Sequence, residues 1–395
     1  MWRSPYGRRR PIRRLIALDT TQQLRVPQPE IRDVLRTVTF WPLIVGGYLR
    51  GAMVTFKLDT QLRSFAGAAA EAAELAEAGV DGLFTFEGPH DGFVPLIVAA
   101  GAFGADAARR LDLYTNVAIA LPRNPMQLAY LANDLQLLSG GRFMLGLGSQ
   151  IKPQIEKRFG VPFDPPVARM RELVLAMRAI FAAWGTGERL RFEGEFYRHT
   201  LLTPMFDPGP NPAGPPPIWL GALGPRMTQM TAEVADGLLV MPFSSERFFN
   251  ENTLPNLTIG LERAGRSRSD ISVTSQAIVC VGRDASEYAA AVGGVKGLLS
   301  FYGSTPAYRP VLDAHGWGDL HTELNTLSKQ GRWVEMIGLI DDEMLQTIAV
   351  CGTPTEVAGQ LKRRFEGVAD RVAFYMPFAA PTALIAEAVD AVKAA

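Results

Sequence analysis

From residue 53 onward the chain alternates short β-branched or aromatic runs with longer runs of helical period. After the first strand-like run, apolar residues recur between Leu62 and Ala76 at three- and four-residue spacing and stop before Gly79, which indicates a helix packed on one face. Eight strand-like runs are predicted, at residues 54–58, 82–86, 113–121, 142–148, 217–220, 237–241, 271–281 and 371–376. Eight β/α units favour an α/β fold of the (β/α)8 TIM-barrel type.

The alternative is an open, dinucleotide-binding sheet. The glycine turn at residues 146–151 lacks the third glycine of a dinucleotide fingerprint, and it follows the fourth strand instead of the first. Helix signals agree with the barrel. Asn124 and Pro125 supply an N-cap and a first-turn proline, and residues 353–356 form a capping box before a helix predicted to reach residue 365.

Two insertions interrupt the repeat. Residues 185–217, after the fourth helix, are rich in proline and contain a possible hairpin around 192–197. Residues 301–340 form a long irregular and helical stretch before the eighth strand. Because excursions from a barrel commonly shape its binding site, we expect both insertions to border a substrate mouth.

The first 52 residues differ from the rest in charge. They hold ten arginines and three acidic residues, whereas the remainder is acidic overall. A targeting signal is disfavoured, because no apolar run and cleavage site follow the basic residues. We expect 1–52 to be a basic extension that is disordered or precedes the physiological start at Met53, with 53–395 as the barrel domain. Packing of residues 40–45 on the barrel domain would argue against the view that residues 1–52 are an extension.

Composition limits the partners. The chain has 40 basic and 40 acidic residues, and this balance does not favour binding to nucleic acid or to an anionic membrane. The expected partner is a small molecule or a second copy of the chain. Cys280 and Cys351 are too few and too far apart for a disulfide scaffold or zinc site, and reduced thiols are expected. No apolar run reaches membrane-spanning length, so we expect a soluble, cytoplasmic protein.

Polar residues at strand ends are the candidates for chemistry, because a TIM barrel carries its active site there. The first strand is expected to end at Asp59, and the second runs into Glu87, His90 and Asp91, the densest ionisable cluster at any strand end. An imidazole there would serve as an acid or base. The alternative interpretation, which the spacing supports equally well, is that His90 and Asp91 only close the loop and that Asp91 caps the next helix. The other three histidines are interpreted as surface residues.

Three further strand ends carry small residues. Their backbones suit the close approach of a flat ring or, at the turn after the fifth strand, of a phosphate beside a helix N-terminus and an arginine. These candidates are Ala118 and Ile119, Gly148 and Ser149, and Gly221, Ala222, Gly224 and Arg226. No GxxxxGK[ST] loop, Gly-x-Ser-x-Gly elbow or metal-ligand pattern occurs.

Taken together, these strand ends resemble the luciferase-like monooxygenase superfamily, and within it the coenzyme F420-dependent oxidoreductases. The most specific stretch is 139–149, which reads S-G-G-R-x-x-L-G-L-G-S. Further similar segments are residues 87–93, 123–129, 192–197, 235–237 and 352–357. The similarity spans roughly residues 53–395. One departure is Gln154, where close relatives tend to have a histidine.

The resemblance implies a barrel that lays a flavin or deazaflavin across its mouth and exchanges a hydride. It places His90 beside the reactive ring carbon, with acidic neighbours at Asp59, Glu87 and Asp91. It also implies a non-proline cis peptide at Ala118–Ile119 against the ring. Phosphate would lie at the turn after the fifth strand, with Gly148 and Ser149 flanking the cofactor. A homodimer is likewise expected by similarity.

Three hypotheses follow. The first is hydride transfer between coenzyme F420 and an unknown organic substrate, with His90 as acid or base. The second is a reduced-FMN-dependent monooxygenase on the same barrel, which oxygen dependence would distinguish. The third is a flavin-binding barrel without turnover, which a His90 side chain turned away from the mouth would favour.

Overall fold

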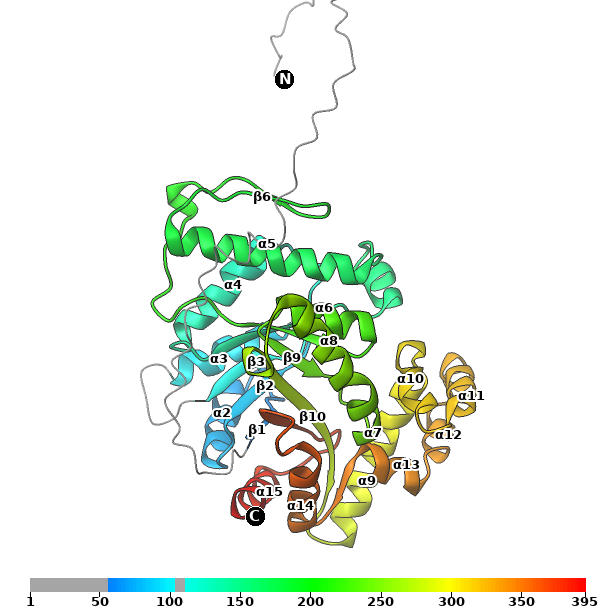
Figure 1. Ribbon diagram of the computed structural model, residues 1–395. Coiled ribbons are helices and arrows are strands. Elements are labelled where there is room, and N and C mark those ends of the chain that lie inside the picture. The colour runs from blue at the N-terminus through cyan, green and yellow to red at the C-terminus, as the bar shows by residue number, and fades with distance from the viewer. Residues whose placement is uncertain (1–55, 104–110) are drawn as a thin grey trace, which may run out of the picture. The chain divides into compact units, whose positions relative to one another are not determined.

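The computed structural model describes residues 56–103 and 111–395, and these form a closed barrel of eight parallel strands (Figure 1). The barrel closes because the last strand pairs with the first, with Arg371 opposite Lys57. The TIM-barrel prediction is therefore confirmed. In pairing order the strands are β1 (Lys57–Gln61), β2 (Gly82–Thr85), β3 (Asp112–Thr115), β5 (Phe143–Gly148), β8 (Ile218–Ala222), β9 (Gly237–Val240), β10 (Ser272–Val281) and β12 (Arg371–Tyr375).

Helices surround the strands, and their ends follow the expected local signals. The Asn124 side chain accepts the Met126 N–H, and Thr353 and Glu356 form the predicted capping box. The surrounding helices are α2 (Ala68–Glu77), α3 (Phe93–Phe103), α4 (Pro125–Leu138), α5 (Pro166–Thr186), α6 (Pro225–Val234), α7 (Glu246–Phe248), α8 (Leu254–Ala264), α14 (Pro354–Phe365) and α15 (Thr382–Ala394).

Some predicted boundaries were wrong. The first strand begins at Lys57, three residues later than expected, and extends past Asp59 to Gln61. The third strand is broken, because β3 ends at Thr115 and a separate β4 (Ala118–Ile119) pairs with the end of β5. Residues 104–110 of an expected helix lie outside the described residues, as do the basic extension 1–52 and its segment 40–45.

The first insertion lies against the outer helices α4 and α5. It contains the predicted hairpin, β6 (Phe192–Glu193) and β7 (Arg198–His199), which lies against α5 because the Glu172 carboxylate accepts backbone N–H groups of the turn. Further along, Asn211 Nδ2 donates to the Asn133 carbonyl of α4 at 3.0 Å. The insertion leaves the C-terminus of α5 and ends at the start of β8, and its hairpin returns along α5, where the Arg169 guanidinium lies over the Phe196 ring. That the first insertion borders a substrate mouth stays a prediction.

The second insertion does border the mouth, as expected. The predicted residues 301–340 belong to a longer excursion, residues 285–352, which is called the second insertion from here on. It comprises α9 (Ala285–Gly303), α10 (Arg309–Asp313), α11 (Gly318–Lys329), α12 (Trp333–Gly338), α13 (Asp342–Ile348) and β11 (Val350–Gly352). Its buried side chains share one cluster with Phe243, and Leu223, Met241 and Tyr375 pack against that cluster. Since those four residues lie at or after the C-terminal ends of β8, β9 and β12, the insertion forms one wall of the barrel mouth.

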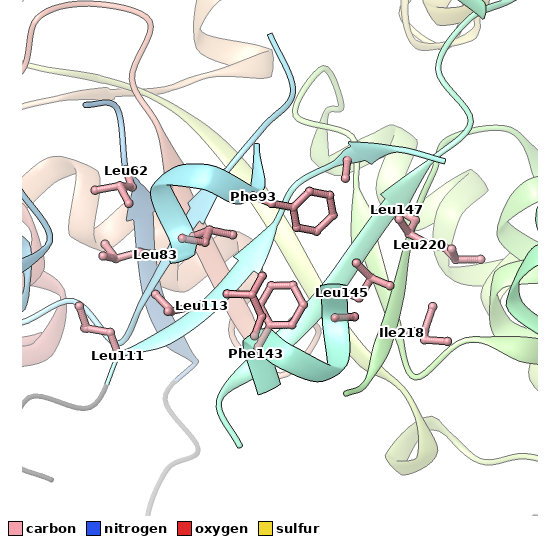
Figure 2. Packing of buried hydrophobic residues seen from close by; sticks show 14 of the residues in the cluster. Leu62, Leu83, Phe93, Leu111, Leu113, Phe143, Leu145, Leu147, Ile218 and Leu220 are labelled. Atoms are coloured by element: carbon pink, nitrogen blue, oxygen red, sulfur yellow. The ribbon is translucent and has the colours of Figure 1, made fainter. Parts of the chain in front are cut away.

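The outer faces of the strands form the main hydrophobic core. Figure 2 shows Leu113, Phe143, Leu145 and Leu220 among the packed side chains, which project from neighbouring strands. Successive residues of a strand point to opposite faces, so the residues between them point into the barrel. That alternation fills both the core outside the barrel and the barrel itself.

The barrel interior is filled from its base upward. At the base, the Arg371 guanidinium binds both oxygens of Asp59 at 2.6 and 2.7 Å and Asp112 at 2.6 Å. The Tyr114 hydroxyl donates to Asp59 at 2.8 Å. An apolar and aromatic cluster accompanies this network, made of Phe84, Tyr114, Met144, Trp219, Leu239 and Ala373, with Val117 packed against it. The lower barrel is thus a packed core. A ligand has room only at the upper end, where the C-terminal ends of the strands form the mouth.

Candidate active site at the barrel mouth

A non-proline cis peptide joins Asn116 and Val117, in the break between β3 and β4. The resemblance implied a cis bond at Ala118–Ile119, which is wrong by two residues. A Cβ built on Gly148 would lie 2.6 Å from Val117 Cγ2, and one on Gly221 would lie 3.1 Å from Val117 Cγ1. The glycines of β5 and β8 therefore make room for a bulge at Val117.

Gly146, one layer below, is required by backbone packing. A Cβ there would lie on the Thr115 carbonyl oxygen, far inside contact distance, and 2.8 Å from Leu239 Cδ1. Because a backbone atom cannot move aside easily, Gly146→Ala is expected to lower the free energy of unfolding by about 2–3 kcal/mol. Urea denaturation measures this. Gly293→Ala is the control, since that helical glycine has open space around its Cβ position, and it should stabilise by about 0.5–1 kcal/mol. Equal effects of the two variants would contradict the assignment.

Glu87 and Asp91 are joined by Arg123. Arg123 Nη1 donates to Glu87 Oε2 at 2.6 Å and to the Ile119 carbonyl at 2.7 Å, while Nη2 donates to Asp91 Oδ2 at 3.0 Å. Glu87 Oε2 also accepts the Ile119 N–H at 2.8 Å. Asp91 Oδ1 accepts the Phe93 N–H and so caps α3. Both carboxylates therefore hold the loop and the segment after the bulge, and their predicted catalytic role stays a prediction.

His90 lies on the exposed rim of the mouth. Its ring stacks on Phe65, from the loop after β1, with centroids 4.5 Å apart and planes at 29°. Arg158, in the loop after β5, donates to the Gly88 carbonyl at 3.0 Å and so joins a third loop to this rim. The imidazole forms no hydrogen bond within the described residues, which leaves both ring nitrogens available. Its role in catalysis stays a prediction.

The remaining candidates lie where expected, at strand ends. Ala118 and Ile119 form β4, which pairs with Leu147 and Gly148. Ser149 follows β5 directly and precedes Gln150, whose φ is +58°. Ala222 ends β8, and Gly224 is the N-cap of α6 without a side chain to cap it. Arg226 is exposed and makes no ion pair among the described residues. Their binding roles also remain predictions.

Asp59 does not belong to the mouth, which corrects its assignment as a cofactor ligand. Its side chain is fully buried, and Arg371 and Tyr114 occupy its oxygens. Burial raises the pKa of Asp59, and the Arg371 guanidinium opposes that rise. Burial would also raise the pKa of Asp112, but Arg371 and Lys57 hold it below its usual value. The strand continues two residues beyond Asp59, so its true end is Gln61.

A histidine joins the second insertion to the mouth. His315 Nε2 lies 2.6 Å from the hydroxyl of Ser245, which also accepts the Phe248 N–H at 3.0 Å. Neutral His315 can accept the Ser245 proton, whereas protonated His315 cannot. The interpretation of three surface histidines was wrong for His321, which is buried and bonds the Gly303 carbonyl at 2.8 Å.

The stability of this contact should depend on pH. Burial lowers the pKa of His315 and Arg247 adds to this, while Glu251 and Glu343 oppose it. The unfolded chain then binds the proton first, so stability contributed by neutral His315 is present above about pH 6.5 and is lost as the pH falls below it. Thermal melts between pH 7.5 and 5.5 should show a smaller loss of Tm for His315→Asn than for the wild type. Identical pH slopes would contradict this.

Sequence reasoning missed three residues of the mouth. Asn116 and Val117 form the bulge, and Arg123 holds both acidic side chains. Arg123 was within reach of a local argument, because it is a cation just ahead of a helix N-cap in an otherwise apolar stretch. The bulge had no local signal beyond the glycines at 148 and 221, since it depends on the pairing of three strands.

Across residues 56–103 and 111–395, no three side chains of the His, Cys, Asp and Glu types gather as a metal site would require. No helix in that part of the chain is long and apolar enough to cross a membrane.

Comparisons with known proteins agree with this architecture. The model of the luciferase-like monooxygenase family matches residues 51–371. An uncharacterised protein of Mycobacterium tuberculosis is 50% identical over 323 residues, covering 82% of this chain and 94% of the relative. A putative coenzyme F420-dependent oxidoreductase of the same organism is 32% identical over 307 residues, covering 73% and 84%. The solved coenzyme F420-dependent tetrahydromethanopterin reductase from Methanopyrus kandleri superposes with a TM-score of 0.71 at 20% identity, covering 87% and 99%.

The barrel with its mouth at the strand ends defines an enzyme of the TIM-barrel class. The chain belongs to the luciferase-like monooxygenase family, and it is accordingly an oxidoreductase.

Proposed function

We propose that this oxidoreductase transfers a hydride between coenzyme F420 and an organic substrate at the barrel mouth. The observation that carries the proposal is the Val117 bulge, which lies on the glycine backbones of β5 and β8. It gives the mouth a firm apolar surface of the kind that a flat ring requires. The F420-dependent relative of 32% identity supports a deazaflavin as that ring.

The residues around the bulge fit a planar heterocycle. Val117 would contact one face of the ring, and its position is held by Gly148, Gly221 and the Arg123 network. Asn116 Nδ2 is buried beside the bulge and has no hydrogen-bond partner among the described residues. We propose that this amide donates to a polar edge of the ring, since an unpaired buried donor is costly.

The turn after β8 fits the phosphate of such a cofactor. Gly224 leaves the first backbone N–H groups of α6 without a side-chain cap. The dipole of α6 and the Arg226 guanidinium both favour an anion there. Ser149 directly follows the neighbouring strand β5 and would supply a hydroxyl beside this turn.

His90 is the candidate for proton transfer. A bound deazaflavin supplies hydride transfer in either direction at its ring. His90 would hold or release the proton on the substrate oxygen, because it lies on the rim with both nitrogens free of hydrogen bonds to the described residues. The second insertion would exclude water from the side of β9 and β12.

The test is a binding titration of the full chain with oxidised coenzyme F420 and, in parallel, with FMN. Protein fluorescence reports the binding. We expect the Kd of the deazaflavin to be at least about tenfold lower than that of FMN. Arg226→Gln should weaken binding. Arg189→Gln is the matched control, because Arg189 is exposed in the first insertion and also lacks an ion pair among the described residues.

The other outcomes separate the alternatives. Tighter binding of FMN would replace the proposal with a reduced-FMN-dependent monooxygenase, which the family also supports. Binding without turnover of any alcohol or aldehyde in a substrate panel would favour a flavin-binding barrel. Binding of neither cofactor would overturn the proposal.

We also propose a homodimer through α3. Its exposed side includes Val94, Ile97 and Val98, which share one helix face and are each more than a third exposed. A second copy of this chain would cover that face. Ile97→Asp is expected to convert the dimer into a monomer, as measured by light scattering. A wild-type protein that is monomeric at micromolar concentration would contradict the proposal.

A further inference from the structure

The two cysteines are in register on neighbouring strands, although 70 residues separate them in the chain. Cys280 of β10 is the Cα partner of Cys351 of β11 in a parallel pair. Adjacent strands lie about 4.8 Å apart, and disulfides join Cα atoms about 4.4–6.8 Å apart. Both side chains belong to the same buried cluster, so they point to the same face of the sheet. A bond between the two sulfurs is within reach of the backbone.

The two thiols have unequal surroundings. Cys280 is fully buried, whereas Cys351 lines a groove of about 1020 Å³ together with Tyr288 and Arg364. The neighbouring Cys280 side chain lowers the pKa of Cys351, and the Arg364 guanidinium adds to the lowering, whereas the pKa of Cys280 is raised by Cys351 and by burial. The Cys351 thiol also lies 4.0 Å from the Leu345 carbonyl oxygen, to which it donates. Cys351 is 9% exposed and Cys280 is fully buried, so the less buried thiol is also the better nucleophile.

We propose that Cys351 and Cys280 form a hydroperoxide-responsive site that is oxidised to an intramolecular disulfide. The Cys351 thiolate attacks the terminal oxygen of the hydroperoxide, the O–O bond breaks, and the alcohol or water leaves with a proton from solvent in the groove. Cys351 is then a sulfenic acid. Cys280 gives up its proton and attacks the Cys351 sulfur, the S–O bond breaks, and that proton leaves in water. Two thiols and one hydroperoxide give one disulfide, one alcohol or water, and one water.

Oxidation would also tie the second insertion to the barrel. The residues between the two cysteines comprise α9–α13, which form the wall of the mouth described above. A cross-link between β10 and β11 closes that whole segment into one loop and restricts its opening. The sequence predicted reduced thiols, and both cysteines are free in this structure. The proposal is that reduced and oxidised forms interconvert.

The experiment treats the reduced full chain with hydrogen peroxide under native conditions and measures its intact mass. The wild type should lose the mass of two hydrogen atoms, and peptide mapping should find the peptides of Cys280 and Cys351 linked. Dithiothreitol should restore both thiols. In the oxidised protein, amide hydrogen exchange in α9–α13 should slow and Tm should rise.

Single variants distinguish the two roles. Cys280→Ser should stop at the sulfenic acid and take up one dimedone, whereas Cys351→Ser should react much more slowly. Circular dichroism checks that each variant folds. If Cys280→Ser does not fold, Cys280→Ala takes its place. Two free thiols in the treated wild type, or disulfides only between molecules, would overturn the proposal. None of these readouts requires a bound cofactor, so the result is independent of the proposed function.

Discussion

Replacing Arg371 by leucine is expected to lower the free energy of unfolding by about 3–5 kcal/mol, the largest stability effect among the variants considered. Arg371 is 5% exposed and forms ion pairs with Asp59 and Asp112 at the base of the barrel, while Lys57 also pairs with Asp112. Its loss leaves two carboxylates without their buried cation. Part of the lost stability should return at low pH, because an unpaired buried carboxyl has a raised pKa and binds its proton more readily in the folded state.

A double variant tests whether the charge is the cause. Asp59→Leu combined with Arg371→Leu removes one buried charge of each sign, so it should be more stable than Arg371→Leu alone. Urea denaturation at pH 7 and pH 5 measures all three proteins. Arg268→Leu is a matched control, because the ion pair of Arg268 with Asp370 is largely exposed, and it should cost less than about 1 kcal/mol. A similar loss for Arg371→Leu and Arg268→Leu would refute the assignment.

Replacing His90 by alanine is expected to reduce turnover by about 10²- to 10⁴-fold, with deazaflavin affinity changed by less than about threefold. The side chain is on the exposed rim and its only described contact is the stack on Phe65, so the fold should persist. The rate is measured on any substrate that the wild type turns over. Added imidazole should restore part of it, which a structural role would not allow.

Two controls frame the His90 result. Phe65→Leu removes the stack but keeps the imidazole, so it should lower turnover less than His90→Ala does. His199→Gln changes a histidine in the β6–β7 hairpin, which packs on α5, and should leave turnover unchanged. Full activity in His90→Ala would remove His90 from the mechanism while leaving the cofactor assignment intact.

The sequence predicted the candidate site in part. The loops after β2, β5 and β8 were identified correctly as strand ends, because each follows a β-branched or glycine-rich run that is visible locally. It did not show which partners the side chains of the site have. Glu87 and Asp91 were predicted as a cluster with His90, and only the folded chain brings Arg123 between the two carboxylates.

The sequence by itself determined the eight strand–helix units, the helix caps at Asn124 and Thr353, and hence the barrel, because hydrophobic period and capping are properties of neighbouring residues. Tertiary structure alone decided the rest. It buried Asp59 against Arg371, 312 residues away, placed the bulge at Val117 on two glycines of other strands, and packed the second insertion against residues at the ends of β8, β9 and β12. These depend on strand pairing and on which end of a strand a loop leaves, which no local pattern encodes.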